Sequence, residues 1–127
     1  MSKKIIFTAA APAPIGPYSQ AVMVGDTLYV SGQIPIDPGT GALVNGTIED
    51  EARQVMLNIG AILKEAGLDF TNVIKTGIFL KDMNNFGKVN EVYGQFFTDQ
   101  YPARETVEVA RLPKDVNVEI SVIAVKD

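Results

Sequence analysis

Residues 116–125, which read VNVEISVIAV, constrain the fold more than any other segment of the chain. The side chains of a strand alternate between its two faces, so this segment, as a strand, has two separate sides. The first side is entirely apolar and consists of Val116, Val118, Ile120, Val122 and Ala124. The second side is apolar in part and consists of Asn117, Glu119, Ser121, Ile123 and Val125. A strand of this kind belongs to a sheet that needs cover on both faces.

Only two segments have helical periodicity, so helices can cover only one of these faces. The first helix begins near Thr47, where a capping-box-like sequence and an acidic first turn favour a helix start. Its apolar stripe ends at Gly67, a residue typical of the position after a helix. The second helix is predicted over roughly residues 84–97, with five side chains facing inward: Phe86, Val89, Tyr93, Phe96 and Phe97.

The rest of the pattern consists of short strands. They are predicted at residues 20–24, 28–31, 73–80, 106–111 and 116–125, with a further strand starting at residues 5–7. This order predicts a two-layer α+β domain of about six strands with both helices on one face. No repeat or linker divides the chain, so residues 1–127 form a single domain. The apolar face without helices predicts self-association through the sheet.

The composition excludes several kinds of chemistry. The 127-residue chain contains no histidine and no cysteine, and so lacks the commonest general base, the thiol nucleophile and the usual zinc ligands. Its net charge is −4 and its longest basic cluster is Lys3-Lys4, whereas nucleic-acid binders normally carry a basic stripe. No apolar run approaches the ~18 residues that span a bilayer, and the N-terminus lacks a signal-peptide pattern. We therefore expect a cytoplasmic protein with no nucleic-acid or membrane partner.

Arg104 and Glu119 are the best candidates for chemistry. Arg104 follows Pro102-Ala103 at the expected junction of a loop and a strand, where its planar guanidinium could bind a carboxylate through two hydrogen bonds. Glu119 lies within the last strand, so its carboxyl group must be paired or have a raised pKa. One interpretation is a carboxylate-binding arginine beside an acid–base glutamate. The alternatives are a structural ion pair for Arg104 and a cross-strand cation for Glu119.

Three further polar positions are weaker candidates. Tyr18 follows the rigid Gly16-Pro17 turn, and its ring either lines a pocket or packs at the edge of the domain. Ser31-Gly32 presents a hydroxyl group and an accessible backbone amide, or simply ends a strand. Asn90 falls on the apolar face of the second predicted helix, where a buried amide needs a hydrogen-bond partner in a loop or in a site. None of these residues identifies a reaction by itself.

Taken together, several motifs resemble those of the Rid (YjgF/YER/UK) family of reactive-intermediate deaminases. The resemblance extends over nearly the whole chain, and the motifs keep their order and spacing. They are Ala13-Pro14-Ile15-Gly16-Pro17-Tyr18, Ser31-Gly32-Gln33-Ile34-Pro35, Val89-Asn90, Pro102-Ala103-Arg104, and VEVARLPKDVNVEI at residues 107–120.

The resemblance implies a chorismate-mutase-like fold and a homotrimer with a central barrel, whose sites lie in the clefts between subunits. It also implies hydrolysis of 2-aminoacrylate, 2-iminobutyrate and related enamine or imine acids to 2-keto acids and ammonia, with no cofactor and no metal. By the same resemblance, Arg104 binds the substrate carboxylate, and Glu119 assists water attack and proton transfer. The other substrate-binding positions that it implies are Tyr18, Ser31, Gly32, Asn90 and Thr106.

Three residues depart from the usual pattern of this family. Thr106 occupies a position that is often cysteine, Glu105 one that is usually small, and Ser121 one that is often a second glutamate. Alternation along a strand predicts that Glu105 points away from the side of Arg104. Because Arg104 and Glu119 are both retained, the resemblance implies that the deaminase activity is retained as well.

Two other function classes stay open on the sequence alone. A regulatory or chaperone-like protein that binds keto acids or partner proteins in the same clefts would use the same arginine. A ribonuclease or translation inhibitor is the other class, and the acidic charge and the lack of histidine weigh against it.

Overall fold

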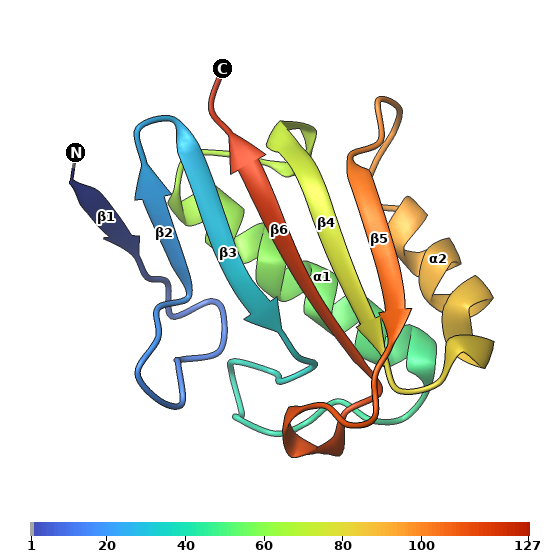
Figure 1. The fold of residues 1–127 in the computed structure, drawn as a ribbon. Helices are drawn as coiled ribbons and strands as arrows, with labels where there is room; N and C mark the ends of the chain where they lie inside the picture. Colours follow the sequence, from blue (N-terminus) through green and yellow to red (C-terminus); the bar gives the residue numbers. More distant parts are fainter. Residues whose placement is uncertain (1) are drawn as a thin grey trace.

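The computed structural model describes residues 2–127, which form one six-stranded sheet with two helices against one of its faces (Figure 1). The strand order is β1-β2-β3-β6-β4-β5, and all neighbouring strands are antiparallel except β4 and β5, which are parallel. The strands are β1 (Lys3–Ile6), β2 (Ala21–Val24), β3 (Thr27–Gln33), β4 (Val73–Leu80), β5 (Ala103–Glu108) and β6 (Val118–Val125).

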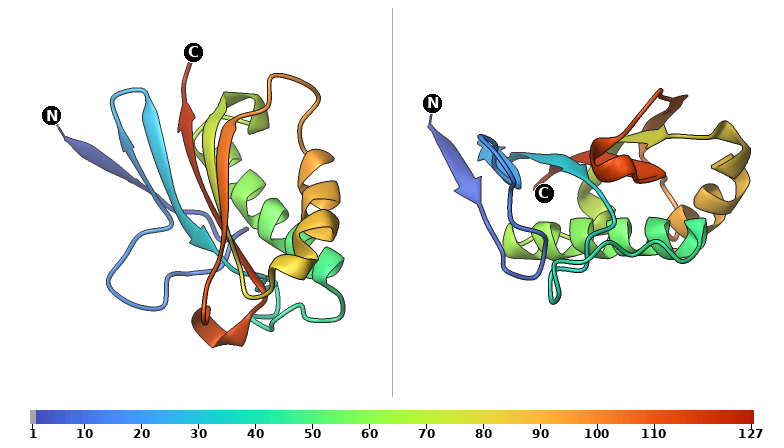
Figure 2. Two further views of the ribbon diagram at one scale, coloured as in Figure 1. Left: turned by 45° about the vertical axis from the view of Figure 1, so that its right-hand side comes forward. Right: turned by 90° about the horizontal axis from the view of Figure 1, so that it is seen from below.

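Helices α1 (Ile48–Glu65) and α2 (Phe86–Gly94) lie on the same side of the sheet, and the views in Figure 2 show no helix on the other side. Three short 3₁₀ turns, η1 (Phe70–Asn72), η2 (Met83–Asn85) and η3 (Pro113–Asp115), connect these elements. The predicted two-layer α+β arrangement, with about six strands and both helices on one face, is confirmed.

The ends of α1 follow the local signals in the sequence. The Thr47 hydroxyl group accepts a hydrogen bond from the backbone N–H of Asp50 at 3.1 Å, which satisfies one of the unpaired donors at the helix start. Gly67 lies just beyond the helix with a φ of +78°, a backbone conformation that side chains disfavour. Between these ends, α1 buries an apolar stripe against the sheet: Ala52, Val55, Met56, Ile59, Ile62 and Leu63.

Strand β6 has the two different sides that its sequence predicts. The apolar side, extended by Val116 just before the strand, is at most 4% exposed and packs against the helices. The residues of the other side are all half-buried. The alternation of the last strand is therefore confirmed, and Glu119 lies on the face that no helix covers.

The side chains of this uncovered sheet face are partly apolar. Registers across the sheet place Ile5 of β1, Tyr29 of β3, Ile123 of β6, Phe79 of β4 and Val107 of β5 on it. Ile5, Tyr29 and Val107 are exposed in the single chain. None of the helices formed by residues 2–127 is long and apolar enough to cross a membrane.

Most predicted bounds differ by one or two residues from those of the structure, and two elements differ by more. The strand predicted at residues 106–111 is β5, Ala103–Glu108, because its parallel register with β4 starts at the pair Lys75–Ala103 and ends at Leu80–Glu108. The helix predicted over residues 84–97 is shorter. It starts after the turn η2, and its last bonds tighten to the 3₁₀ type, with Phe96 N–H donating to the Tyr93 carbonyl.

Candidate active site

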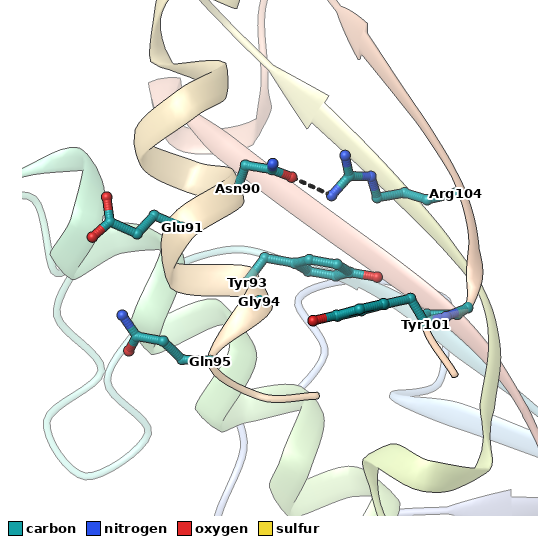
Figure 3. A pocket seen from close by; sticks show the side chains of 8 residues that line it. Asn90, Glu91, Tyr93, Gly94, Gln95, Tyr101 and Arg104 are labelled. Carbon is teal, nitrogen blue, oxygen red and sulfur yellow. Dashed lines mark hydrogen bonds between the residues drawn. The ribbon is translucent and has the colours of Figure 1, made fainter. Parts of the chain in front are cut away.

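Arg104 is the second residue of β5, and its side chain points to the helix side of the sheet. It is paired with Thr76 of β4, and Thr76 is paired with Val122 on the buried side of β6. Directly paired residues point to the same face of a sheet, so all three lie on the side of the helices. Figure 3 shows the guanidinium of Arg104 extending toward α2.

Three side chains of α2 hold the Arg104 guanidinium in place. Its Nη1 donates a 2.6 Å hydrogen bond to Oδ1 of Asn90 (Figure 3). Its carbon Cζ lies 5.0 Å from the ring centre of Tyr93 and 5.5 Å from that of Phe86, within the range of cation–π attraction. Asn90, predicted to be a buried amide, is exposed and faces the site instead. Phe86, predicted to face inward, is 38% exposed.

Arg104 has no carboxylate partner among the residues that the structure describes. The ion pairs within residues 2–127 are Lys75–Glu105 at 3.1 Å and Arg111–Asp115 at 2.7 Å. The alternative of a structural ion pair for Arg104 therefore does not hold within this part of the chain. A half-buried arginine that is aligned by an amide and two rings retains the ability to bind an anion.

A cavity of about 750 Å³ opens beside this guanidinium, between α2 and the residues that lead into β5 (Figure 3). Arg104 is the sole cation among the described residues that line it, and Glu91 is the sole anion. The Tyr93 hydroxyl group donates a 3.0 Å hydrogen bond to Oγ1 of Thr76, and burial raises the pKa of Tyr93. The ring thus stays neutral and fixed. The remaining lining residues are Asn90, Gly94, Gln95, Tyr101 and Pro102.

Glu119 lies on the opposite face of the sheet. It is paired with Phe79 of β4, while its neighbours Val118 and Ile120 are buried among the helices. The side chain is half-buried, and this burial raises the pKa of the Glu119 carboxyl group above the ordinary value. A carboxyl group with a raised pKa exchanges protons at a pH closer to neutrality, as acid–base catalysis requires.

Gly32 permits the burial of Glu119. A methyl group on Gly32 would overlap with Oε2 of Glu119 and would lie 2.8 Å from its Cδ, so only glycine leaves room for the carboxyl group here. Both residues line a second cavity, of about 540 Å³. Its other lining residues are Ile15, Tyr18, Ser31, Ile34, Pro113 and Lys114.

Tyr18 and Ser31 are fixed by bonds within this second cavity. The Tyr18 hydroxyl oxygen accepts a hydrogen bond from the backbone N–H of Ile15 at 3.2 Å, and both residues line the cavity. The Ser31 hydroxyl group donates to the carbonyl of Ser19 at 2.5 Å. The structure thus brings four of the predicted residues together: Tyr18, Ser31, Gly32 and Glu119.

Arg104 and Glu119 do not meet within one chain. Strand β4 lies between β5 and β6, and the two side chains point to opposite faces of the sheet. The prediction that the arginine lies beside the glutamate is therefore wrong for a single chain. Thr106 lies on the face of Arg104, and its Oγ1 is buried without a hydrogen-bond partner among residues 2–127.

Two of the departures from the family's pattern share the face of Glu119. Glu105 and Ser121 are both paired with Gly77, and Glu105 is bonded to Lys75. The prediction that Glu105 points away from Arg104 is confirmed. Its charge is directed to Lys75 rather than to the cavity beside the arginine.

Several aromatic and turn residues that line the two cavities are not among the predicted site residues. Tyr93 was assigned only to the core, although it is the ring under Arg104. Tyr101 had a usable signal, because it directly precedes the Pro102-Ala103-Arg104 motif. Lys114 had none: it lies in the turn η3, where its backbone takes a left-handed conformation with a φ of +56°, and it lines the second cavity.

Replacing Gly32 with alanine is expected to expel the Glu119 carboxyl group into solvent. Its pKa then falls toward the ordinary value, because the burial that raises it is lost. NMR titration of the glutamate carboxyl carbons measures this shift. Gly87→Ala is the matched control, since an added methyl group there has no atom within 4 Å. An unchanged Glu119 pKa in Gly32→Ala would contradict the role given to Gly32.

Known proteins resemble this chain over almost its whole length. Residues 8–126 match the family model described as endoribonuclease L-PSP. A Bos taurus protein named 2-iminobutanoate/2-iminopropanoate deaminase is 56% identical over 98% of this chain and 90% of its own length. The crystal structure of the Rid family protein YyfA from Yersinia pestis is 49% identical, with a TM-score of 0.96 over 98% of this chain and 100% of that one. The structure of E. coli TdcF with bound serine is 47% identical, with a TM-score of 0.94 over 98% and 99%. The chain therefore belongs to this family, the Rid family that its motifs predict.

Proposed function

We propose that this protein hydrolyses small 2-imino acids, and the enamines that tautomerise to them, to 2-keto acids and ammonia. Substrates of this kind are 2-aminoacrylate and 2-iminobutyrate. The observation that carries the proposal is the Arg104 guanidinium, which faces a cavity without a carboxylate partner among the described residues. A relative that is 56% identical is named as a deaminase of 2-imino acids, and another has been crystallised with serine, a small ligand with a carboxylate.

Arg104 has the geometry to bind the carboxylate that all these substrates share. A guanidinium can donate two parallel N–H bonds to a carboxylate, provided that its plane is fixed. Here the hydrogen bond to Asn90 and the contact with the Tyr93 ring both fix that plane before a substrate arrives. Fixing the arginine in advance removes an ordering cost from substrate binding.

The opposite orientations of Arg104 and Glu119 support a site formed between two copies of the chain. A small imino acid cannot contact both side chains of one chain, because the sheet separates them. Packing several copies through the partly apolar sheet face would bring Glu119 of one copy to the cleft edge of another, and would cover Ile5 and Tyr29. A homotrimer in which the sheets form a central barrel is the assembly that we propose.

Hydrolysis starts from the protonated imine, C=NH2+, and consumes one water molecule. The carboxylate of Glu119 accepts a proton from water while the water oxygen bonds to the imine carbon, and the C=N double bond becomes a single bond to a neutral NH2 group. The resulting carbinolamine then loses ammonia: the Glu119 carboxylic acid protonates the nitrogen, the C–N bond breaks, and the hydroxyl group closes to the keto group as its proton passes to the solvent. Because the imine carbon is already electrophilic, positioning and proton transfer suffice, and no covalent intermediate with the protein is required.

Loss of the arginine is expected to abolish catalysis without unfolding the protein. Arg104→Ala removes the charged hydrogen bonds to the substrate carboxylate, so kcat/KM should fall by at least about 10²-fold. A coupled assay that generates 2-aminoacrylate or 2-iminobutyrate in situ measures this loss. Lys64→Ala is the matched control, because Lys64 is an exposed cation in the last turn of α1 and lines neither cavity. Activity close to that of the wild type in Arg104→Ala would rule out the carboxylate-binding role.

Mixing two inactive variants tests whether each site uses two copies. Arg104→Ala and Glu119→Gln are each expected to be inactive alone. After they are unfolded and refolded together, about one quarter of the sites should combine an intact arginine with an intact glutamate from the next copy. Recovery of about that fraction of wild-type activity is expected. If the mixture stays as inactive as its components, no site combines Arg104 of one copy with Glu119 of another, and the proposed assembly is wrong.

The ionised carboxyl group of Glu119 is expected to be needed for catalysis and to destabilise the folded protein. Activity requires the carboxylate, so it should fall as the pH drops through the pKa of Glu119, which burial raises above the ordinary value of a glutamate. Because the folded pKa exceeds the unfolded one, the stability contributed by the neutral form is lost as the pH rises through the folded pKa.

Glu119→Gln removes this charge and tests both effects. The variant should lose about 10²–10⁴-fold in kcat, yet unfold at a higher temperature than the wild type at pH 7. Thermal unfolding at pH 4 and pH 7 measures the second effect, and the gain should be larger at pH 7. A variant that is less stable than the wild type at pH 7 would mean that burial of Glu119 is not costly.

The description of the family model raises a second candidate, an endoribonuclease. RNA cleavage by the purified protein that disappears in Arg104→Ala would favour this function. A protein that binds 2-ketobutyrate through Arg104 but hydrolyses no imine would instead be a ligand-binding regulator.

A further inference from the structure

Glu51 is a buried carboxyl group outside both cavities. It lies in the first turn of α1 and is only 2% exposed. One of its oxygens accepts a hydrogen bond from the backbone N–H of Asn117 at 3.0 Å, and the other accepts one from Nδ2 of Asn117 at 2.7 Å. Both oxygens are therefore committed to a single residue of another element, 66 positions further along the chain.

Asn117 is the residue at which a strained turn joins β6. Before it, Lys114 and Asp115 have left-handed backbones, with φ of +56° and +57°. Its carbonyl accepts a hydrogen bond from the N–H of Lys81 at 3.1 Å, just beyond the end of β4. Asn117 is thus held by one bond to the sheet side and two bonds to α1.

Glu119 depends on this junction because it is only the second residue of β6. The last pairs between β4 and β6 are Phe79–Glu119 and Leu80–Val118, at the end of the ladder. Strand ends open most easily, since fewer hydrogen bonds hold them. The hydrogen bonds of Asn117, the residue before β6, therefore fix the start of this strand. Pro113 and Lys114, in the turn just before Asn117, line the same cavity as Glu119.

We propose that Glu51 is a positioning residue for Glu119: through Asn117 it fixes the start of β6, and with it the catalytic carboxyl group against Gly32. This inference rests on the proposed function, since it assigns Glu51 to the same site. Glu51 itself touches no substrate. It acts by fixing the wall of the cavity that carries the acid–base group.

The other walls of this cavity are held independently of Glu51. Asn58 of α1 is buried, and its Nδ2 donates to the carbonyls of Ile34 and Ile36 at 3.3 and 3.0 Å, beside Gly32. Loss of the Glu51 bonds should therefore displace the segment of residues 113–119 alone. The cavity should keep its shape elsewhere, and binding of the carboxylate by Arg104 should be unaffected.

Glu51→Gln tests the proposal with little change in shape. The glutamine side chain keeps one accepting oxygen, but its NH2 group only donates, so one of the two N–H groups of Asn117 loses its partner. The expected result is a fall in kcat of about 10- to 100-fold, with KM within about twofold of the wild type, because the reacting carboxyl group is displaced while substrate binding is not. NMR titration should also show the Glu119 pKa returning toward its ordinary value.

Two further variants separate positioning from general loss of stability. In Glu51→Gln/Asn117→Asp the hydrogen-bonding groups are exchanged: the amide of residue 51 donates to the carboxylate of residue 117 and accepts from its backbone N–H. This double variant should recover most of the lost kcat. Asn72→Ala is the control, because Asn72 bonds to the carbonyl of Val125 at the other end of β6. It should lower the unfolding temperature and leave kcat unchanged.

Each result decides the proposal. The proposal is wrong if Glu51→Gln changes neither kcat nor the pKa of Glu119. It is also wrong if Glu51→Gln and Asn72→Ala lose the same amount of stability and the same amount of kcat. If kcat does not recover in the double variant, the hydrogen bonds between residues 51 and 117 do not position Glu119, and the proposal is wrong. If the wild type has no deaminase activity, the proposed function fails, and the Glu119 pKa in the Glu51 variants still tests the positioning separately.

Discussion

The place of β6 between β3 and β4 is the constraint on which both the core and the candidate site depend. The side chains of β6 alternate between the face that packs against the helices and the open face. The pairing register that buries Ile120 under the helices therefore places Glu119 on the open face. A shift of this strand by one residue would bury Glu119 in the core and expose Ile120. The large cost of such a shift keeps the carboxyl group on the open face.

The same sheet separates Arg104 from Glu119 within one chain. Arg104 projects from the edge strand β5 to the helix side, where Asn90 and Tyr93 hold it. Glu119 projects to the other side, beside Gly32. The two groups to which we assign the reaction are thus separated by the thickness of a sheet. The partly apolar open face gives copies of the chain a reason to associate, and association is what would unite the groups.

Local and periodic features of the fold could be predicted from the sequence, whereas long-range pairing could not. The cap at Thr47, the stop at Gly67 and the two sides of β6 depend on nearby residues, and they are confirmed. The bounds of β5 were wrong because they are set by its parallel partner, almost 30 positions earlier in the chain. Arg104 and Glu119 were found as residue types, but their placement on opposite faces follows from β4 lying between them. No local pattern encodes that order.

Two glutamates show how the same side chain can serve stability or chemistry. Glu51 is almost completely buried, and both of its oxygens accept hydrogen bonds from Asn117, so its burial is compensated. Glu119 is only half-buried, yet burial raises its pKa. The difference lies in the donors that face each group. A carboxyl group without compensating donors is unstable as an anion and therefore readily takes up a proton, which a base in hydrolysis must do. In the positioning that we propose, the fully satisfied Glu51 holds Glu119 through Asn117, and this relation would link α1 to the catalytic end of β6.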